Sequence, residues 1–243
     1  MMNTTQLRYE VLRIYRFPLN VGLTVALPLV VYYAVTPSNR HAHPEGITFA
    51  LYFMTGMAAY GAMFAAVTPG ARIARDRASG WARHARTTPL RASTYFASKV
   101  VASYAVAIPT LGLLYLAGAS LGVRLGATTW LEMTGLLLIG LAPFVVIGIT
   151  LGHLGTADAM VPAMAGSVIL FALLGGAFGR LFTGGVGLTI VKLLPSYWLV
   201  QAGASASTGG GDWPAEGWIV LAVWIVALVP LAVLAYQRDT SRV

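Results

Sequence analysis

The chain contains no cysteine, and only 10% of its 243 residues are charged. The absence of cysteine excludes a disulfide framework, a thiol nucleophile and a cysteine-ligated metal site. The shortage of charge argues against an ordinary soluble domain, in which about a quarter of the residues are charged. A lipid-facing surface requires such a shortage, because an ionisable group in hydrocarbon costs several kcal/mol.

Sequence motifs that would support catalysis are missing as well. The stretch AGSV at 165–168 lacks the G-x-S-G of an intramembrane serine protease, and no histidine lies in the last apolar segment. There is no H-E-x-x-H, and GGGD at 209–212 lacks the Lys-Ser/Thr of a phosphate-binding loop. A proton relay would need ionisable residues in series across the membrane, and none is found. Catalysis by this chain alone is therefore not expected.

Apolar residues make up 57% of the chain, and the mean hydropathy is +0.73. A helix needs roughly 20 residues to cross a bilayer core of about 30 Å. Six stretches reach that length, so we predict an all-α polytopic membrane protein with a single transmembrane domain over residues 1–243. The predicted spans are 17–35, 47–70, 94–118, 130–152, 159–179 and 217–236.

Lysine and arginine are distributed unequally between the loops that these spans leave. Of the 16 basic residues, one side of the membrane holds twelve and the other only Arg40, Arg124, Arg180 and Lys192. The positive-inside rule then places both termini and the 71–93 loop in the cytoplasm. Membrane topology thus explains the net charge of +8, and no nucleic-acid partner is expected.

A few polar residues lie at the ends of the predicted spans. Lys99 and Asp158 are near cytoplasmic ends and Glu132 is near an outer end. Long side chains reach water there, so we expect interface anchoring rather than contact with a substrate. His153 has no second histidine nearby, so a metal site is not expected.

Gly148 and Gly152 form a G-x-x-x-G on one face of the fourth predicted span. Small residues in this pattern let helix backbones approach closely. Internal helix packing is the favoured interpretation, and a subunit interface is the alternative.

Two segments fit neither a span nor a simple loop. Residues 5–16 place apolar side chains on one helical face and arginines on the other, which predicts an amphipathic helix on the inner leaflet. A ragged start to the first span is the alternative.

Residues 180–201 are apolar but interrupted by glycines and Pro195. Because irregular backbone at membrane depth must be buried in protein or line a cavity, we predict a re-entrant helical hairpin there, with a surface-lying helix as the alternative.

The stretch ARDRASGWARHARTTPLR at 74–91 holds five arginines, one histidine and a single acid. A solvated loop that only sets the membrane topology would explain the arginines of this stretch. It would not explain the positions of Gly80, Trp81 and Pro89 among them. Gly80 permits a turn and Pro89 ends the segment before the third span. Trp81 between arginines combines an apolar anchor with a polar rim, which is typical of a docking surface.

In this stretch the sequence resembles the ABC-2 type permeases, the membrane subunits of bacterial ABC exporters, and among them a drug-exporter-like subgroup. Their first cytoplasmic loop has an acidic-Arg pair, a glycine four residues after the acid, and a Thr/Ser-Pro eight and nine residues after that glycine. The matching residues here are Asp76, Arg77, Gly80, Thr88 and Pro89. Ala78 stands where a second acid is usual, and Arg83 and Arg86 stand among positions where leucines are usual.

The resemblance extends along the chain. Family members have an amphipathic connecting helix, six spans and an outer re-entrant region between spans five and six. That region begins with a glycine pair, here Gly175 and Gly176, and ends with a Pro-Ser-Tyr element. The matching residues of that element here are Pro195, Ser196, Tyr197 and Trp198. The Phe-Pro that is usual between these elements is missing.

The resemblance implies a fold like that of type V ABC exporters, in the inner membrane of a bacterium. The chain would pair with a second permease subunit, identical or different, and bind a separate cytoplasmic ATPase. It would hold no cofactor itself, since Mg-ATP belongs to the partner. Residues 71–90 would be the coupling helix, with Asp76, Arg77 and Trp81 contacting the ATPase and Gly80 and Pro89 shaping the turn. Arg83 and Thr88 belong to the same predicted coupling site.

The substrate is predicted from the shortage of charge. A path with few charges suits hydrophobic or amphiphilic cargo, such as a drug, a lipid or a secondary metabolite, and no substrate-binding residue is identified. Two alternatives stay open: an ATP-independent channel or small carrier, and a membrane anchor or immunity-type interaction protein.

Overall fold

The computed structural model describes residues 18–79, 92–207 and 213–241, and all the regular structure in these ranges is helical. The predicted amphipathic segment at 5–16 lies outside them. Two 3-10 turns, Pro37–Asn39 and Pro44–Gly46, follow the first helix. The α-helices are α2 (Pro18–Val35), α3 (Phe49–Ala78), α5 (Ala92–Ser120), α6 (Ala127–Gly140), α7 (Ala142–Leu154), α8 (Ala157–Gly175), α9 (Gly185–Lys192), α10 (Pro195–Ser207) and α11 (Ala215–Ser241).

Five helical segments are long and apolar enough to cross a membrane. They are Phe49–Ala78, Thr94–Ser120, Ala127–Leu154, Ala157–Gly175 and Ala215–Arg238. They coincide with the second to sixth predicted spans, so the chain has the architecture of a polytopic helical membrane protein. The first predicted span coincides with α2, and its crossing of the membrane stays a prediction.

Helix α3 is the central element of the bundle, with 83% of its most apolar window buried. It packs against α2, α5, α7, α8 and α10. Its 30 residues span about 45 Å at 1.5 Å per residue. The helix continues through the buried Pro69 and Gly70 to Ala78, eight residues beyond the predicted end of the span at residue 70. Packing between α7 and α8 holds these two helix breakers in helical conformation.

The crossing of α3 and α7 is built from glycines. A Cβ atom added at Gly148 would lie 2.6 Å from Val67 Cα, and one added at Gly152 would lie 2.6 Å from Gly70 O. Real Cβ atoms do not approach backbone so closely, so the two helices are in direct backbone contact. Internal packing by the G-x-x-x-G pattern is therefore confirmed.

The fourth predicted span is divided into α6 and α7 at Leu141, and Pro143 is the second residue of α7. Proline lacks the N–H that a continuous helix needs, and its ring crowds the preceding turn. The break lets the two halves contact different partners. Helix α6 packs against α10, whereas α7 packs against α3 and α11.

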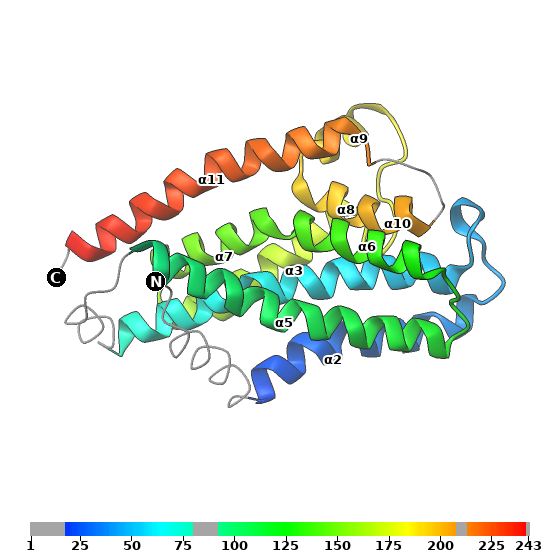
Figure 1. Ribbon diagram of the computed structural model, residues 1–243, viewed down its shortest axis with the longest axis horizontal. Helices are drawn as coiled ribbons and strands as arrows, with labels where there is room; N and C mark the ends of the chain where they lie inside the picture. Colours follow the sequence, from blue (N-terminus) through cyan, green and yellow to red (C-terminus); the bar gives the residue numbers. More distant parts are fainter. Residues whose placement is uncertain (1–17, 80–91, 208–212, 242–243) are drawn as a thin grey trace.

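The helices run between two ends of the molecule (Figure 1). The last turn of α3, the start of α5 and the last turn of α11 lie together at one end. We call this the basic end, because the described basic residues on these helices are Arg72, Arg75, Arg77, Lys99 and Arg238. The opposite end, called the hairpin end, carries α9, α10 and the connections 36–48 and 121–126.

Candidate functional site at the two ends of the bundle

Asp76 and Arg77 are the two predicted coupling residues that the structure describes. They lie in the last turns of α3, so residues 71–78 of the predicted coupling segment continue this helix. Gly80, Trp81, Arg83, Thr88 and Pro89 fall outside the described residues.

Arg77 ties the end of α3 to the end of α7. Its Nη1 donates hydrogen bonds to Gly152 O at 3.3 Å and to Gly155 O at 3.1 Å. Gly155 is the C-cap of α7, so the guanidinium lies at the negative end of that helix dipole. The sequence did not predict that Arg77 bonds to the end of α7. Arg75, two residues earlier, is exposed, whereas Asp76 and Arg77 are half-buried.

An aromatic cluster joins α5, α7 and α11 at the same end. The Tyr95 hydroxyl lies 3.4 Å from His153 Nε2, and the Tyr95 and His153 rings both pack on the ring of Tyr236. His153 is buried, and none of the described residues form a group that could hold a metal ion.

The side chain of Lys99 lies beside this cluster. Its Nζ is 5.4 Å from the centroid of the Tyr95 ring, a cation–π contact, and the residue is only 5% exposed. The expectation that Lys99 reaches water is therefore wrong. Asp158 and Glu132 are exposed, as expected of residues at helix ends.

At the hairpin end the glycine pair terminates α8. Gly176 adopts a left-handed backbone with φ 84°. The Ala177 N–H donates to Ala172 O at 2.9 Å and the Gly176 N–H donates to Leu173 O at 3.2 Å. These two bonds form a Schellman motif, which favours glycine at this position because a Cβ would be strained there.

The glycine pair and the Pro-Ser-Tyr element, 20 residues apart in sequence, are in contact. A Cβ added at Gly175 would lie 2.8 Å from the carbonyl carbon of Ser196, which is completely buried. Pro195 is the first residue of α10, a position where its missing N–H costs nothing. The end of α8 is thereby packed directly on the start of α10.

The predicted 180–201 region contains two helices, α9 and most of α10. Helix α10 packs against α3, α6 and α8, so a single surface-lying helix does not describe the region. Helix α9 is held at its C-terminal end. Trp198 Nε1 donates to Lys192 O at 2.6 Å, and Trp224 Nε1 donates to Leu193 O at 2.8 Å. Indole N–H groups thus satisfy carbonyls that the helix end leaves without partners.

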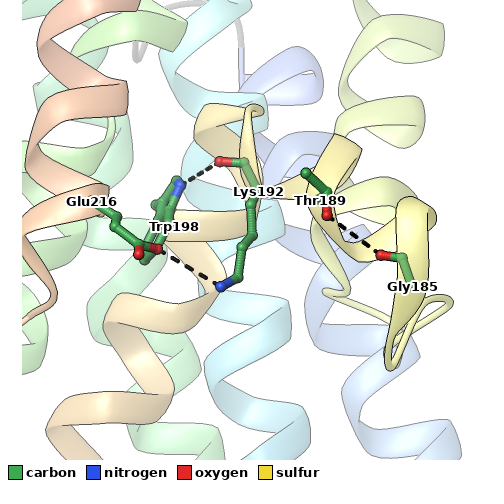
Figure 2. Close-up of polar contacts among 5 residues, drawn as sticks. All are labelled: Gly185, Thr189, Lys192, Trp198 and Glu216. Atoms are coloured by element: carbon green, nitrogen blue, oxygen red, sulfur yellow. Dashed lines mark hydrogen bonds and ion pairs between the residues drawn. The ribbon is translucent and has the colours of Figure 1, made fainter.

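Figure 2 shows the contacts around Lys192, from α9 across to α11. The Trp198 indole approaches the Lys192 carbonyl, while Lys192 Nζ lies 3.7 Å from Glu216 Oε2. The two side chains of this ion pair are 41% and 69% exposed, so solvent screens it. Trp198 itself is buried in a small cluster with Trp213 and Leu221. The buried indole therefore holds α9 more firmly than the ion pair does.

The Trp198→Phe variant is expected to loosen α9, because phenylalanine keeps an aromatic ring but removes the N–H. Loss of a buried hydrogen bond costs about 1–2 kcal/mol, so trypsin cleavage after Lys192 should accelerate about tenfold. The matched control is Glu216→Gln, which removes a screened ion pair worth about 0.5 kcal/mol or less. Equal acceleration in both variants would contradict this account of how α9 is held.

Comparison with known proteins finds similarity to a protein named as a transport permease. The chain is 25% identical over 170 residues to a Bacillus subtilis (strain 168) protein named "Putative transport permease YvfS", and the alignment covers 69% of each chain. No protein-family model matches the sequence, and no solved structure matches it. The aligned length is far greater than any one helix, so the similarity involves several spans rather than a local motif.

Proposed function

We propose that this chain is the transmembrane permease subunit of an ATP-driven exporter of the ABC-2 type. The observation that carries the proposal is the similarity to a protein named as a transport permease over two thirds of both chains. The loop motif around Asp76 and Arg77, and the glycine pair packed on Ser196, support the finer assignment. The chain moves its substrate outward across a bacterial inner membrane, with the basic end in the cytoplasm.

The energy comes from a separate ATPase subunit, which binds Mg-ATP and docks on residues 71–90. This chain has no phosphate-binding loop of its own. A second permease subunit completes the transporter. Asp76, Arg77 and Trp81 contact the ATPase, with Arg83 and Thr88 in the same segment, and Gly80 and Pro89 shape the turn that presents them.

Helix α3 transmits movement from the docking segment into the membrane. It is one continuous helix from the hairpin end to Ala78, so a displacement at its basic end displaces the whole rod. The Arg77 hydrogen bonds and the glycine crossing make α7 follow α3, because neither helix has room to slide over the other. ATP binding shifts the equilibrium only if the ATPase contacts this end differently in its two states.

The other end of α3 touches the hairpin. The carbonyl of Ala177 lies against Gly56, so closely that a Cβ at Gly56 would overlap it. A Cβ at Gly203 of α10 would lie 3.0 Å from Thr55 Cβ. Movement of α3 therefore reaches both the end of α8 and helix α10.

Hydrophobic or amphiphilic cargo fits the surface of the spans. Only 22% of the α8 window and 17% of the α11 window are buried, and their exposed side chains, such as Val161, Leu170 and Val226, are apolar. Such faces suit contact with lipid, with a second subunit, or with cargo that enters from the bilayer.

ATP hydrolysis tests the proposal. The tagged chain, purified in mild detergent from its native membrane, is expected to bring with it vanadate-sensitive ATP hydrolysis that co-elutes with the chain. The chain lacks a nucleotide motif, so this activity must come from a partner. A channel or carrier that works without ATP predicts hydrolysis no higher than in a preparation from cells without the tag.

A further inference from the structure

An apolar cleft opens towards the hairpin end between two consecutive helices, α5 and α6. The connection 121–126 joins these helices (Figure 1), but α5 packs mainly on α3 whereas α6 packs on α10. The cleft left between them has a volume of about 730 Å³. Small-molecule sites measure about 300–1,000 Å³, so this cleft has room for part of a lipid.

The lining of the cleft is almost wholly apolar. The rings of Tyr115 on α5 and Trp130 on α6 form one wall, and they pack on each other with their centroids 4.7 Å apart. Leu113 and Leu116 line the cleft as well, and both are exposed. Gly112 keeps the space open, because a Cβ added there would meet no atom within 4 Å. These groups suit a hydrocarbon chain.

The length of the cleft matches one leaflet of a bilayer. Its lining on α5 runs from Pro109 to Ala119, a rise of about 15 Å. This is half of a hydrocarbon core of about 30 Å. Nearer the basic end, the Tyr104 hydroxyl donates to Leu138 O at 2.9 Å and so joins α5 to α6. A membrane-spanning helix of a partner would need a groove of twice this length, so the dimensions favour the acyl chain of a lipid.

A cation lies at the mouth of the cleft. Arg124 is in the connection between Ala119 on α5 and Trp130 on α6, which both line the cleft. Arg124 is exposed, and within the described part of the chain it forms no ion pair or hydrogen bond, not even with Glu132. Tryptophan is typical of the head-group level of a membrane, where a guanidinium can bind a phosphate with paired hydrogen bonds.

We propose that this cleft binds one acyl chain of an anionic phospholipid, and that Arg124 holds the phosphate of the same molecule. Lipid tails are as apolar as the cleft, so the hydrophobic effect does not drive this binding. The close contacts along the aromatic wall and above Gly112 favour a chain of the right shape. Arg124 favours an anionic lipid, because a choline head group carries a cation of its own. The inference goes beyond the proposed function, since it requires only that the bundle lies in a bilayer.

Native mass spectrometry of the purified full chain in detergent tests the charge requirement. It compares phosphatidylglycerol with phosphatidylcholine that carries the same acyl chains. The wild type should bind phosphatidylglycerol about fivefold more tightly, the effect of one cation near an anionic head group. Arg124→Gln should abolish this preference. The matched control is Arg40→Gln, which removes an exposed cation at the same end but outside the cleft and should leave the preference unchanged.

Gly112→Leu tests the seat of the acyl chain in the same assay. The new side chain would extend into the cleft, and its Cβ would meet no other atom of the bundle within 4 Å, so the fold should persist. Binding of both lipids should weaken about fivefold, because the leucine displaces about ten atom contacts of the chain. The matched control is Gly166→Leu on α8, where a Cβ also meets no atom within 4 Å, and it should leave binding unchanged.

The inference is overturned if the wild type binds the two lipids equally, or if the preference survives Arg124→Gln. It is also overturned if Gly112→Leu and Gly166→Leu have the same effect. A dimer without bound lipid that Gly112→Leu dissociates would assign the cleft to a second copy of the chain instead, and would overturn the inference too. None of these results involves the ATPase, so a failure here leaves the proposed exporter intact.

Discussion

Gly148→Ala is expected to lower the stability of the folded bundle by about 2–3 kcal/mol, the cost of overpacking a tightly packed core. The added methyl would lie 2.6 Å from Val67 Cα and 2.9 Å from Val67 O. These are backbone atoms, so no rotamer change relieves the contact and α3 must move away from α7. The loss is measured as a lower midpoint of thermal unfolding of the purified protein in detergent. Gly148→Leu, which adds three further carbons, is expected to prevent folding.

Gly166→Ala is the matched control for this prediction. Gly166 also lies in an apolar helix, α8, but a Cβ added there meets no atom within 4 Å. Alanine favours helix by about 1 kcal/mol over glycine, so this variant should be neutral or slightly more stable. Equal destabilisation by the two substitutions would mean that the α3–α7 crossing does not depend on glycine.

Arg77→Glu is expected to reduce the ATP turnover of the transporter about tenfold while the chain still inserts in the membrane. The substitution replaces a donor to Gly152 O and Gly155 O with a carboxylate that those carbonyls repel. A hydrogen bond to a charged group contributes about 1.5–3 kcal/mol, so the end of α3 detaches from α7. Movement at the proposed docking segment would then no longer displace α7. The readout is vanadate-sensitive ATP hydrolysis of the purified complex in lipid vesicles.

Arg75→Glu makes the same charge change two residues earlier, on an exposed side chain. It controls for the effect of net charge on the basic end, and turnover should stay within about twofold of the wild type, as expected for an exposed charge. If both variants lose turnover equally, charge at this end matters and the tie between α3 and α7 does not.

The positions of the long helices follow from the sequence, because the length of an apolar run sets where a helix can span a bilayer. The end of α3 does not, because the local signal at Pro69 and Gly70 is outweighed by packing on α7 and α8. The residues next to Pro69 and Gly70 do not indicate that this part of the helix is buried against other helices. The break at Leu141 does follow from the local sequence, since Pro143 lies in the first turn of α7, where a proline is tolerated.

The candidate residues at the basic end and at the hairpin end could be predicted from the sequence to different degrees. The glycine pair at 175–176 and the Pro-Ser-Tyr element were recognised, but only the structure shows that Gly175 and Ser196 touch. The acceptors of Arg77 lie 75 and 78 residues further along the chain, and nothing in the sequence connects them. The burial of Lys99, by contrast, could have been predicted from the sequence. Tyr95 is four residues earlier, a spacing that places both side chains on one helix face.

The central claim, that this chain is the membrane half of an ATP-driven exporter, is tested most directly by purification of the tagged chain and quantitative mass spectrometry of what accompanies it. We predict an ATP-binding subunit at about one copy per chain, as docking on each permease subunit requires. We also predict its loss when Trp81 and Arg83 are replaced by alanine, with the chain still in the membrane. A wild-type chain that purifies from several mild detergents without any ATP-binding subunit would contradict the account and favour an ATP-independent channel or carrier.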